Sequence, residues 1–217
     1  MLPLSDDVLG GVRSILLLGA HPDDIELGCG ATVLTLARKR PDLRVRWVVM
    51  SGTRDRAAEA RASAAAFLDG IDETEVVVND FPDRYFPSDY EGLKHAVRAA
   101  GRDFDADLVL THQRGDLHQD HRLLSELTLN TFRDHLILEY EISKYDGDLG
   151  QPNVFVDVGR DAVDRKTSLL MKHFPSQRDR DWFDEETFRA LMRLRGVECH
   201  ARDGYAEAFY GRKIRLL

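Results

Sequence analysis

Cysteine is scarce in this sequence. Only Cys29 and Cys199 occur among 217 residues, too few for the disulfide framework of a secreted domain, which predicts a reducing cytoplasm as the location. No apolar run approaches the ~20 residues of a membrane-spanning helix. Residues 1–11 include Asp6 and Asp7 and lack the basic start and apolar stretch of a signal peptide. We therefore expect a cytoplasmic protein with no membrane span.

Positive charge is also in short supply. The chain has 30 Lys and Arg residues against 38 Asp and Glu residues, and its formal net charge is -8 at pH 7. A protein that binds nucleic acid needs a basic face to displace the counterions of the phosphates, so we expect no nucleic-acid partner. With 43% hydrophobic residues, a chain of this length can bury one core, and we expect a single domain over residues 1–217.

Glycine does not form a nucleotide-binding fingerprint here. Gly28 and Gly30 are followed by no third glycine at the required spacing, and residues 21–24, His-Pro-Asp-Asp, fill the turn before them. A dinucleotide cofactor is therefore not expected. The carboxylate pair at this position would also repel a bound phosphate, which counts against a nucleotide-binding domain.

Apolar runs typical of strands alternate along the chain with stretches typical of helices. We predict strands at residues 15–18, 44–50, 75–78, 107–111, 136–140, 153–158 and 205–210, and helices at 27–40, 55–68, 90–100, 122–132, 161–174 and 185–194. This alternation implies parallel strands joined by crossover helices. The predicted fold class is α/β, a Rossmann-like three-layer α/β/α architecture with a mostly parallel sheet and the active site at the C-terminal edge of the strands.

Two clusters of histidine and aspartate follow two of the predicted strands. The first cluster ends the strand at 15–18, and the second follows the strand at 107–111. Their members are His21, Asp23, Asp24, His118, Asp120 and His121. Loops that follow parallel strands lie at one edge of the sheet, so the clusters can meet. Two imidazoles and one carboxylate around an open position are typical of a catalytic zinc, with the remaining groups left for proton transfer. The spacing alone does not select the ligands.

Each member of these clusters has a simpler explanation when taken alone. Asp23 or Asp24 would cap a helix N-terminus, and His118 or His121 would be a loop histidine with a polar partner. Capping does not require two such clusters, so the joint pattern favours a metal site. Cys29 lies in a small-residue stretch and is expected to pack in the core rather than to act as a nucleophile.

Three further segments have two open interpretations. Arg54, Arg56 and Glu59 form either a solvated helix face or a group that binds a substrate hydroxyl, carboxylate or phosphate. The aromatic side chains of the loop at 81–87 are expected to pack in the core, although they could also form the wall of a pocket. The polar loop at 144–153 suits sugar hydroxyls, although a solvated surface loop would have the same composition.

The pairing of AHPDDIE at residues 20–26 with HQDH at 118–121 resembles the PIG-L/LmbE-like zinc N-deacetylase family, whose signatures read AHPDD followed by E, and HPDH. The similarity extends to Arg56 and Glu59 and to the AEAF segment at 206–209. The sequence departs from the common pattern at Gln119, where the family has proline. This change replaces none of the histidine and aspartate residues of the two signatures.

This resemblance implies a role for each residue of the two clusters. His21, Asp24 and His121 would ligate the metal, Asp23 would be the general base on the zinc-bound water, His118 the acid or the oxyanion partner, and Asp120 the group that orients a histidine. Asp116 takes the place of an active-site tyrosine found in some members of the family. Tyr145 is the candidate substitute for that tyrosine, and Arg56 and Tyr145 are the expected substrate-binding residues.

The resemblance, together with the two clusters, implies a metal-dependent hydrolase. It would remove an N-acetyl group from an N-acetylglucosamine-type substrate, giving a free amine and acetate, with Zn²⁺ as the cofactor and Fe²⁺ as the alternative ion. Its expected partner is a small N-acetylated sugar conjugate, and the sequence leaves both the carrier of that sugar and any homo-oligomer open. The alternatives are an amidase for a larger N-acyl group and a non-catalytic metal-binding α/β domain.

Overall fold

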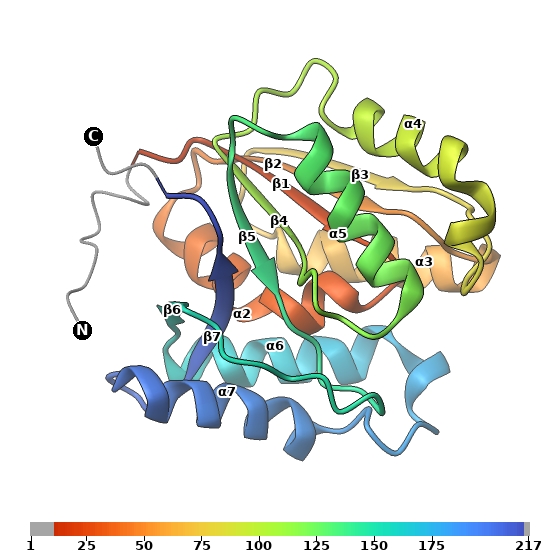
Figure 1. The fold of residues 1–217 in the computed structure, drawn as a ribbon. Coiled ribbons are helices and arrows are strands. Elements are labelled where there is room, and N and C mark those ends of the chain that lie inside the picture. Colours follow the sequence, from red (N-terminus) through yellow and green to blue (C-terminus); the bar gives the residue numbers. More distant parts are fainter. Residues whose placement is uncertain (1–10, 215–217) are drawn as a thin grey trace.

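A mixed sheet runs through the computed structural model, which describes residues 11–214 (Figure 1). Its seven strands lie in the order β3-β2-β1-β4-β5-β7-β6. They are β1 (Ser14–Gly19), β2 (Arg44–Val49), β3 (Glu73–Val78), β4 (Leu108–His112), β5 (Leu136–Tyr140), β6 (Val154–Asp157) and β7 (Ala206–Gly211). The first five are parallel, and β7 runs antiparallel to both β5 and β6. The predicted α/β class with a mostly parallel sheet is confirmed.

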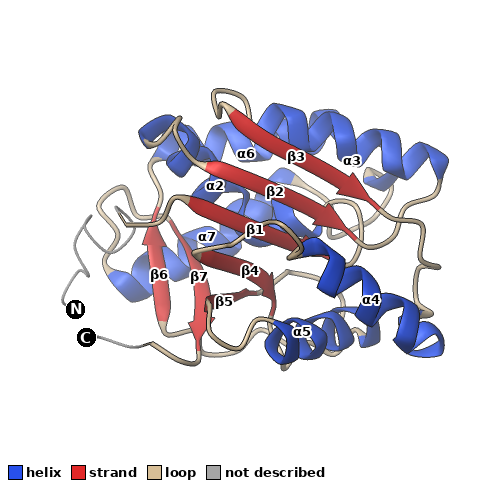
Figure 2. Ribbon diagram, turned by 90° about the horizontal axis from the view of Figure 1, so that it is seen from above, coloured by secondary structure: helices blue, strands red, loops and turns tan. Residues whose placement is uncertain are grey.

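Helices cover both faces of the sheet (Figure 2). They are α2 (Asp24–Lys39), α3 (Arg54–Phe67), α4 (Tyr90–Ala100), α5 (Gln119–Thr131), α6 (Arg160–His173) and α7 (Glu185–Cys199), with short 3₁₀ turns η1 (Phe86–Asp89) and η2 (Pro175–Gln177). None of the helices between residues 11 and 214 has the length and apolar character needed to cross a membrane. The prediction that residues 1–11 are not a signal peptide is not tested, because residues 1–10 lie outside the described part of the chain.

Strand β1 is the centre of the core because its side chains alternate between the two layers. Ile15 and Leu17 pack with α2, α3, α6 and α7 in one buried cluster. Leu16 and Leu18 pack with α4 and α5 in the other. These four side chains are at most 2% exposed, which explains why the strand reads as a continuous apolar run.

The chain changes direction across the sheet between β1 and β4. From β1 it proceeds outward through β2 to β3, and it then returns to place β4 on the other side of β1. In α/β sheets, ligands bind in the crevice at such a reversal, outside the carboxyl ends of the strands. Both histidine and aspartate clusters follow the two strands that flank this crevice.

Two helices begin three residues earlier than predicted, and both differences matter for the site. Helix α2 starts at Asp24 rather than at residue 27, and α5 starts at Gln119 rather than at residue 122. Strand β4 extends one residue further than predicted, to His112. The polar residues at these ends carry no apolar periodicity, so the sequence pattern assigned them to loops. Asp24, Asp120 and His121 therefore lie in the first turns of helices.

Candidate active site

The carboxyl ends of β1 and β4 bring the two clusters into contact. His21 lies in the turn after β1, Asp24 begins α2, and His121 lies in the first turn of α5. The Nδ1 atom of His21 lies 3.1 Å from Nε2 of His121, although the residues are 100 positions apart. Both nitrogens lie 3.5 Å from Oδ2 of Asp24. The three atoms form a nearly equilateral triangle.

The second ring nitrogen of each histidine faces a carboxylate outside this triangle. His121 Nδ1 lies 3.0 Å from Asp116 Oδ2, and His21 Nε2 lies 3.1 Å from Asp120 Oδ2. A carboxylate accepts a hydrogen bond from an N–H, so each contact places the proton on the outer nitrogen of the ring. The inner nitrogens then present lone pairs to the triangle.

The triangle has the dimensions of a metal site. Ligands about 2.0–2.2 Å from a tetrahedral zinc lie about 3.4 Å from one another, close to the 3.1 Å and 3.5 Å observed. Without a cation, the two lone pairs and the carboxylate would face one another. Although burial lowers the pKa of His21, hydrogen bonds to Asp120, Asp24 and Asp83 raise it well above its usual value, which shows that the surrounding carboxylates favour a positive charge at this point. His21, Asp24 and His121 therefore fit a divalent metal.

Asp23 lies beside the triangle in a strained backbone conformation. Its φ is 100°, a region that costs a non-glycine residue on the order of 1–3 kcal/mol. It occupies the N-cap position of α2, but within the described chain its side chain makes no capping hydrogen bond. Instead, Oδ2 lies 3.3 Å from Nη2 of Arg56, which also donates to the Pro22 carbonyl. Helix capping therefore does not explain Asp23.

The environment of Asp23 suits proton transfer near neutral pH. Burial raises the pKa of this carboxyl to about 7, against the opposing effect of the Arg56 charge and with a further increase from Asp24. A group with a pKa near the working pH can both accept and release a proton.

Asp120 and His118 adjoin the triangle without being part of it. Asp120 is fully buried and accepts the N–H groups of Arg84 and Phe86, which orients its carboxylate toward His21. The Nδ1 atom of His118 accepts the Asp120 N–H at 3.3 Å, so its proton lies on Nε2. Burial, followed by the charge of His21, lowers the pKa of His118. The imidazole is therefore neutral near pH 7, with one N–H to donate.

Asp116 has a larger part in the site than the sequence suggested. Besides its contact with His121, its Oδ1 accepts the backbone N–H of His118 at 2.8 Å and lies 3.2 Å from Nζ of Lys144. Although burial raises the pKa of Asp116, His121 and Lys144 hold it well below its usual range. A carboxylate that orients a metal-binding histidine is a common feature of metal sites. The sequence signal that could have identified Asp116 was its position five residues before His121.

His112 was also missed as a site residue. It is fully buried at the end of β4, where its Nε2 accepts the Ala20 N–H at 3.0 Å and lies 3.2 Å from Asp24 Oδ2. Its ring stacks on His121 with the centroids 4.0 Å apart. The sequence places His112 directly after the predicted strand, at the same edge of the sheet, but no partner at a metal-ligand spacing singles it out.

A cavity of about 370 Å³ opens beside His21, within the size range of small-molecule sites. The segment after β2 supplies Arg54 and Arg56 to its wall, and the segment after β3 supplies Phe81 and Asp83. The aromatic loop therefore has both expected uses, because Phe81 lines the cavity while Phe86 is fully buried in the core.

The two expected substrate-binding residues differ in their surroundings. Arg56 lines the cavity, where substrate binding was expected of it. It also contacts the Asp23 carboxylate and so orients it. The Tyr145 side chain is 68% exposed and follows Lys144, which pairs with Asp116. Binding of substrate by Arg56 and Tyr145 stays a prediction.

The carboxyl group of Glu26 is buried in α2, and no basic side chain among residues 11–214 pairs with it. Glu26 is 1% exposed, and neither of its carboxyl oxygens has a hydrogen-bond partner among residues 11–214. Burial raises the pKa of Glu26 to about 8 against the opposing effect of the nearby Ser63 hydroxyl, and the charges of Asp23 and Asp24 contribute to the increase. The side chain is therefore held in its neutral form at pH 7.

Replacing Glu26 with glutamine is expected to stabilise the protein at neutral pH. The carboxyl ionises near pH 4.5 in the unfolded chain and near pH 8 in the folded one, so wild-type stability falls as the pH rises through that window. Glutamine does not titrate, so the variant should gain up to about 3 kcal/mol at pH 7 and nothing below pH 4.5. Chemical denaturation at pH 4.5 and pH 7, at equal metal content, measures the difference. Equal stability changes at both pH values would contradict this account.

Comparison with known proteins gives a consistent family and fold. The family model described as PIG-L, GlcNAc-PI de-N-acetylase, matches residues 16–132. The uncharacterized deacetylase YaiS of Escherichia coli K12 is 29% identical over 185 residues, covering 74% of this chain and 90% of that protein.

Two solved structures share the fold at low sequence identity. The N,N'-diacetylchitobiose deacetylase of Pyrococcus horikoshii superposes with a TM-score of 0.71 at 20% identity, over 93% of this chain and 84% of that one. GalB, the 4-carboxy-2-hydroxymuconate hydratase of Pseudomonas putida KT2440, gives 0.73 at 18% identity, over 94% and 98%. The fold thus supports more than one reaction, and the residues of the site decide which one a given chain performs.

Proposed function

This chain belongs to the PIG-L family of de-N-acetylases, and on that premise we propose that it is a metal-dependent N-deacetylase. Its substrate would be an N-acetylglucosamine-type amino sugar, which it would hydrolyse to a free amine and acetate. The observation that carries the proposal is the triangle formed by His21, Asp24 and His121, with Asp23 beside it and an open cavity next to it. Structural zinc sites are usually closed by four protein ligands, which favours a catalytic site here.

Zn²⁺ is the proposed ion, with Fe²⁺ as the alternative, held by His21, Asp24 and His121. When bound, it would supply a Lewis acid that acidifies a water molecule and polarises the amide carbonyl. The histidine-rich donor set supports this assignment, because imidazole suits zinc and iron, whereas magnesium and calcium prefer oxygen ligands throughout.

Asp23 is the proposed proton carrier of the reaction. Its carboxylate would accept a proton from the attacking water as the oxygen forms a bond with the amide carbon. The same proton would pass to the amide nitrogen when the C–N bond breaks, so that a neutral amine leaves together with acetic acid, which then releases its remaining proton to solvent and becomes acetate. The contact with Arg56, 3.3 Å from Asp23 Oδ2, would hold the carboxylate in place for both transfers.

His118 is the proposed oxyanion partner rather than the acid. Its lowered pKa leaves the ring neutral, and the hydrogen bond at Nδ1 leaves the Nε2–H free to donate. A fixed N–H directed at the carbonyl oxygen stabilises the negative charge that develops there. Asp120 would act through His21, whose ring it orients.

The extent of the catalytic unit and its location belong to the proposal as well. We propose a single deacetylase domain over residues 1–217, because one sheet combines strands from Ser14 to Gly211. A cytoplasmic location is proposed from the low cysteine content.

Metal content and amine release test the proposed function together. Protein purified without chelator is expected to contain about one zinc or iron per chain and to release amine from N-acetylglucosamine or N,N'-diacetylchitobiose. Chelator should abolish the activity, and added Zn²⁺ should restore it. Protein that binds neither metal would refute the site. Metal binding without amine release from either sugar would favour the amidase alternative, which longer N-acyl glucosamines would then test.

A further inference from the structure

Helix α2 is broken in its middle. Cys29 has φ and ψ of -143° and 16°, which are not helical, so residues 24–28 form a short segment ahead of the longer one. The short segment begins with Asp24 and directly follows Asp23. Its placement therefore decides where these two carboxylates lie.

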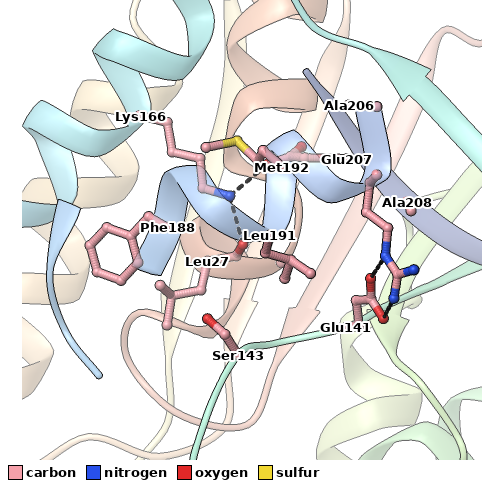
Figure 3. Close-up of a pocket in the computed structure, with 12 residues that line it drawn as sticks. Leu27, Glu141, Ser143, Lys166, Phe188, Leu191, Met192, Ala206, Glu207 and Ala208 are labelled. Atoms are coloured by element: carbon pink, nitrogen blue, oxygen red, sulfur yellow. Dashed lines mark hydrogen bonds and ion pairs between the residues drawn. The ribbon is translucent and has the colours of Figure 1, made fainter. Parts of the chain in front are cut away.

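A buried ion pair occupies the break (Figure 3). Lys166 in α6 and Glu207 in β7 are 2% and 4% exposed, and their Nζ and Oε1 atoms lie 2.7 Å apart. Lys166 donates to the Leu27 carbonyl at 2.6 Å, and Glu207 accepts the N–H groups of Ala31 at 2.9 Å and Thr32 at 2.6 Å. In a regular α-helix the N–H of Ala31 would donate to the carbonyl of Leu27. Here Lys166 binds the carbonyl and Glu207 binds the N–H.

The charges of the pair match the two helix ends at the break. The short segment ends in exposed carbonyl dipoles, which a cation stabilises, and the longer one begins with exposed N–H dipoles, which an anion stabilises. Close packing limits any shift of this region. A Cβ on Gly28 would lie 2.1 Å from the ring of Tyr140, and one on Gly30 would lie 2.7 Å from the ring of Phe67.

We propose that Lys166 and Glu207 are positioning residues for the metal site. They hold the short segment of α2 at the angle that places Asp24 in the triangle and Asp23 beside it. The inference rests on the proposed metal binding by His21, Asp24 and His121. This role also gives a physical reason for the acidic residue Glu207 in the AEAF segment at 206–209. The segment lies outside residues 16–132, which the family model matches, whereas α2 lies within them.

Zinc affinity of a Glu207→Gln variant tests this inference. The substitution keeps the size of the side chain but removes the charge that holds Lys166 and two N–H groups. We expect zinc affinity to fall about 10- to 100-fold, the effect typical of groups that orient metal ligands from outside the ligand set. Competition with a chromogenic chelator measures this affinity without any substrate. Lys166→Met should weaken zinc binding in the same direction and serves as the second variant if Glu207→Gln does not fold.

Glu141→Gln is the matched control. Glu141 pairs with Arg195 at 2.6 Å, and both side chains are buried. Together with Lys166 and Glu207 they line a small pocket that is separate from the cavity beside His21 (Figure 3). Within the described chain this pair makes no hydrogen bond to α2. We expect the control to lower the melting temperature as Glu207→Gln does but to change zinc affinity by less than about twofold.

Two results would overturn the inference and leave the proposed function intact. One is wild-type zinc affinity in both Glu207→Gln and Lys166→Met. The other is an equal loss of affinity in Glu141→Gln, since the effect would then reflect general destabilisation. Failure of the wild-type protein to bind zinc or iron would instead refute the proposed function on which the inference rests.

Discussion

An Asp23→Asn variant is expected to keep its metal and to lose turnover about 10²- to 10⁴-fold, the usual contribution of a positioned acid-base group. Asparagine can still accept a hydrogen bond from Arg56, which lies 3.3 Å from Asp23 Oδ2, so the turn should remain folded. It cannot accept the proton of the attacking water. Metal analysis and amine release on the same preparation, assayed with N-acetylglucosamine or N,N'-diacetylchitobiose, give the two readouts.

The adjacent Asp24 provides the comparison for this variant. Asp24→Asn makes the same chemical change at the next residue, whose Oδ2 atom lies 3.5 Å from both His21 Nδ1 and His121 Nε2. This variant should lose metal and turnover together. An Asp23→Asn protein that retains more than about a tenth of wild-type turnover would rule out Asp23 as the proton carrier. An Asp23→Asn protein without metal would move Asp23 into the ligand set.

His121→Ala is expected to abolish metal binding and, with it, activity. The substitution removes one corner of the triangle, and a divalent ion held by His21 and Asp24 alone would exchange into solvent. Metal content after dialysis should fall below about a tenth of an equivalent. His95→Ala is the control, since this α4 histidine has a side chain that is 71% exposed, and its removal should leave metal content unchanged.

Asp116→Asn should give an intermediate result. The variant keeps the imidazole of His121 but removes the charge 3.0 Å from its outer nitrogen, so zinc affinity should fall about 10- to 100-fold. Full metal retention in His121→Ala would refute the triangle. Wild-type affinity in Asp116→Asn would show that the ring is oriented by its packing against His112, whose ring centroid lies 4.0 Å away.

Local sequence patterns were sufficient for the order of the elements and for where the chemistry lies along the chain. The apolar run at residues 15–18 is short enough to be a buried strand, and the proline that follows His21 favours a turn at its end. Alternation of strands and helices implied parallel crossovers, and parallel crossovers place the loops after β1 and β4 at the same edge. The proximity of the two histidine and aspartate clusters follows from these local facts.

The boundaries of the elements were less predictable because site residues interrupt the periodic signal. Asp24 and His121 face the crevice from the first turns of α2 and α5, where side chains serve the site rather than the core. The apolar pattern of each helix therefore begins about one turn after the helix itself, so the sequence predicts a helix that is too short. His112 was assigned outside its strand for the same reason.

By itself, the sequence determined the α/β fold, the edge of the sheet that holds the site and the residue types available there. Only the tertiary structure decided which atoms converge, that Asp116 supports His121, that Arg56 contacts Asp23, and that Lys166 and Glu207 occupy the break in α2. Glu207 lies 176 positions from Ala31, and no local pattern specifies such a contact. It depends on strand order, register and the angle between packed elements, which are properties of the folded chain as a whole.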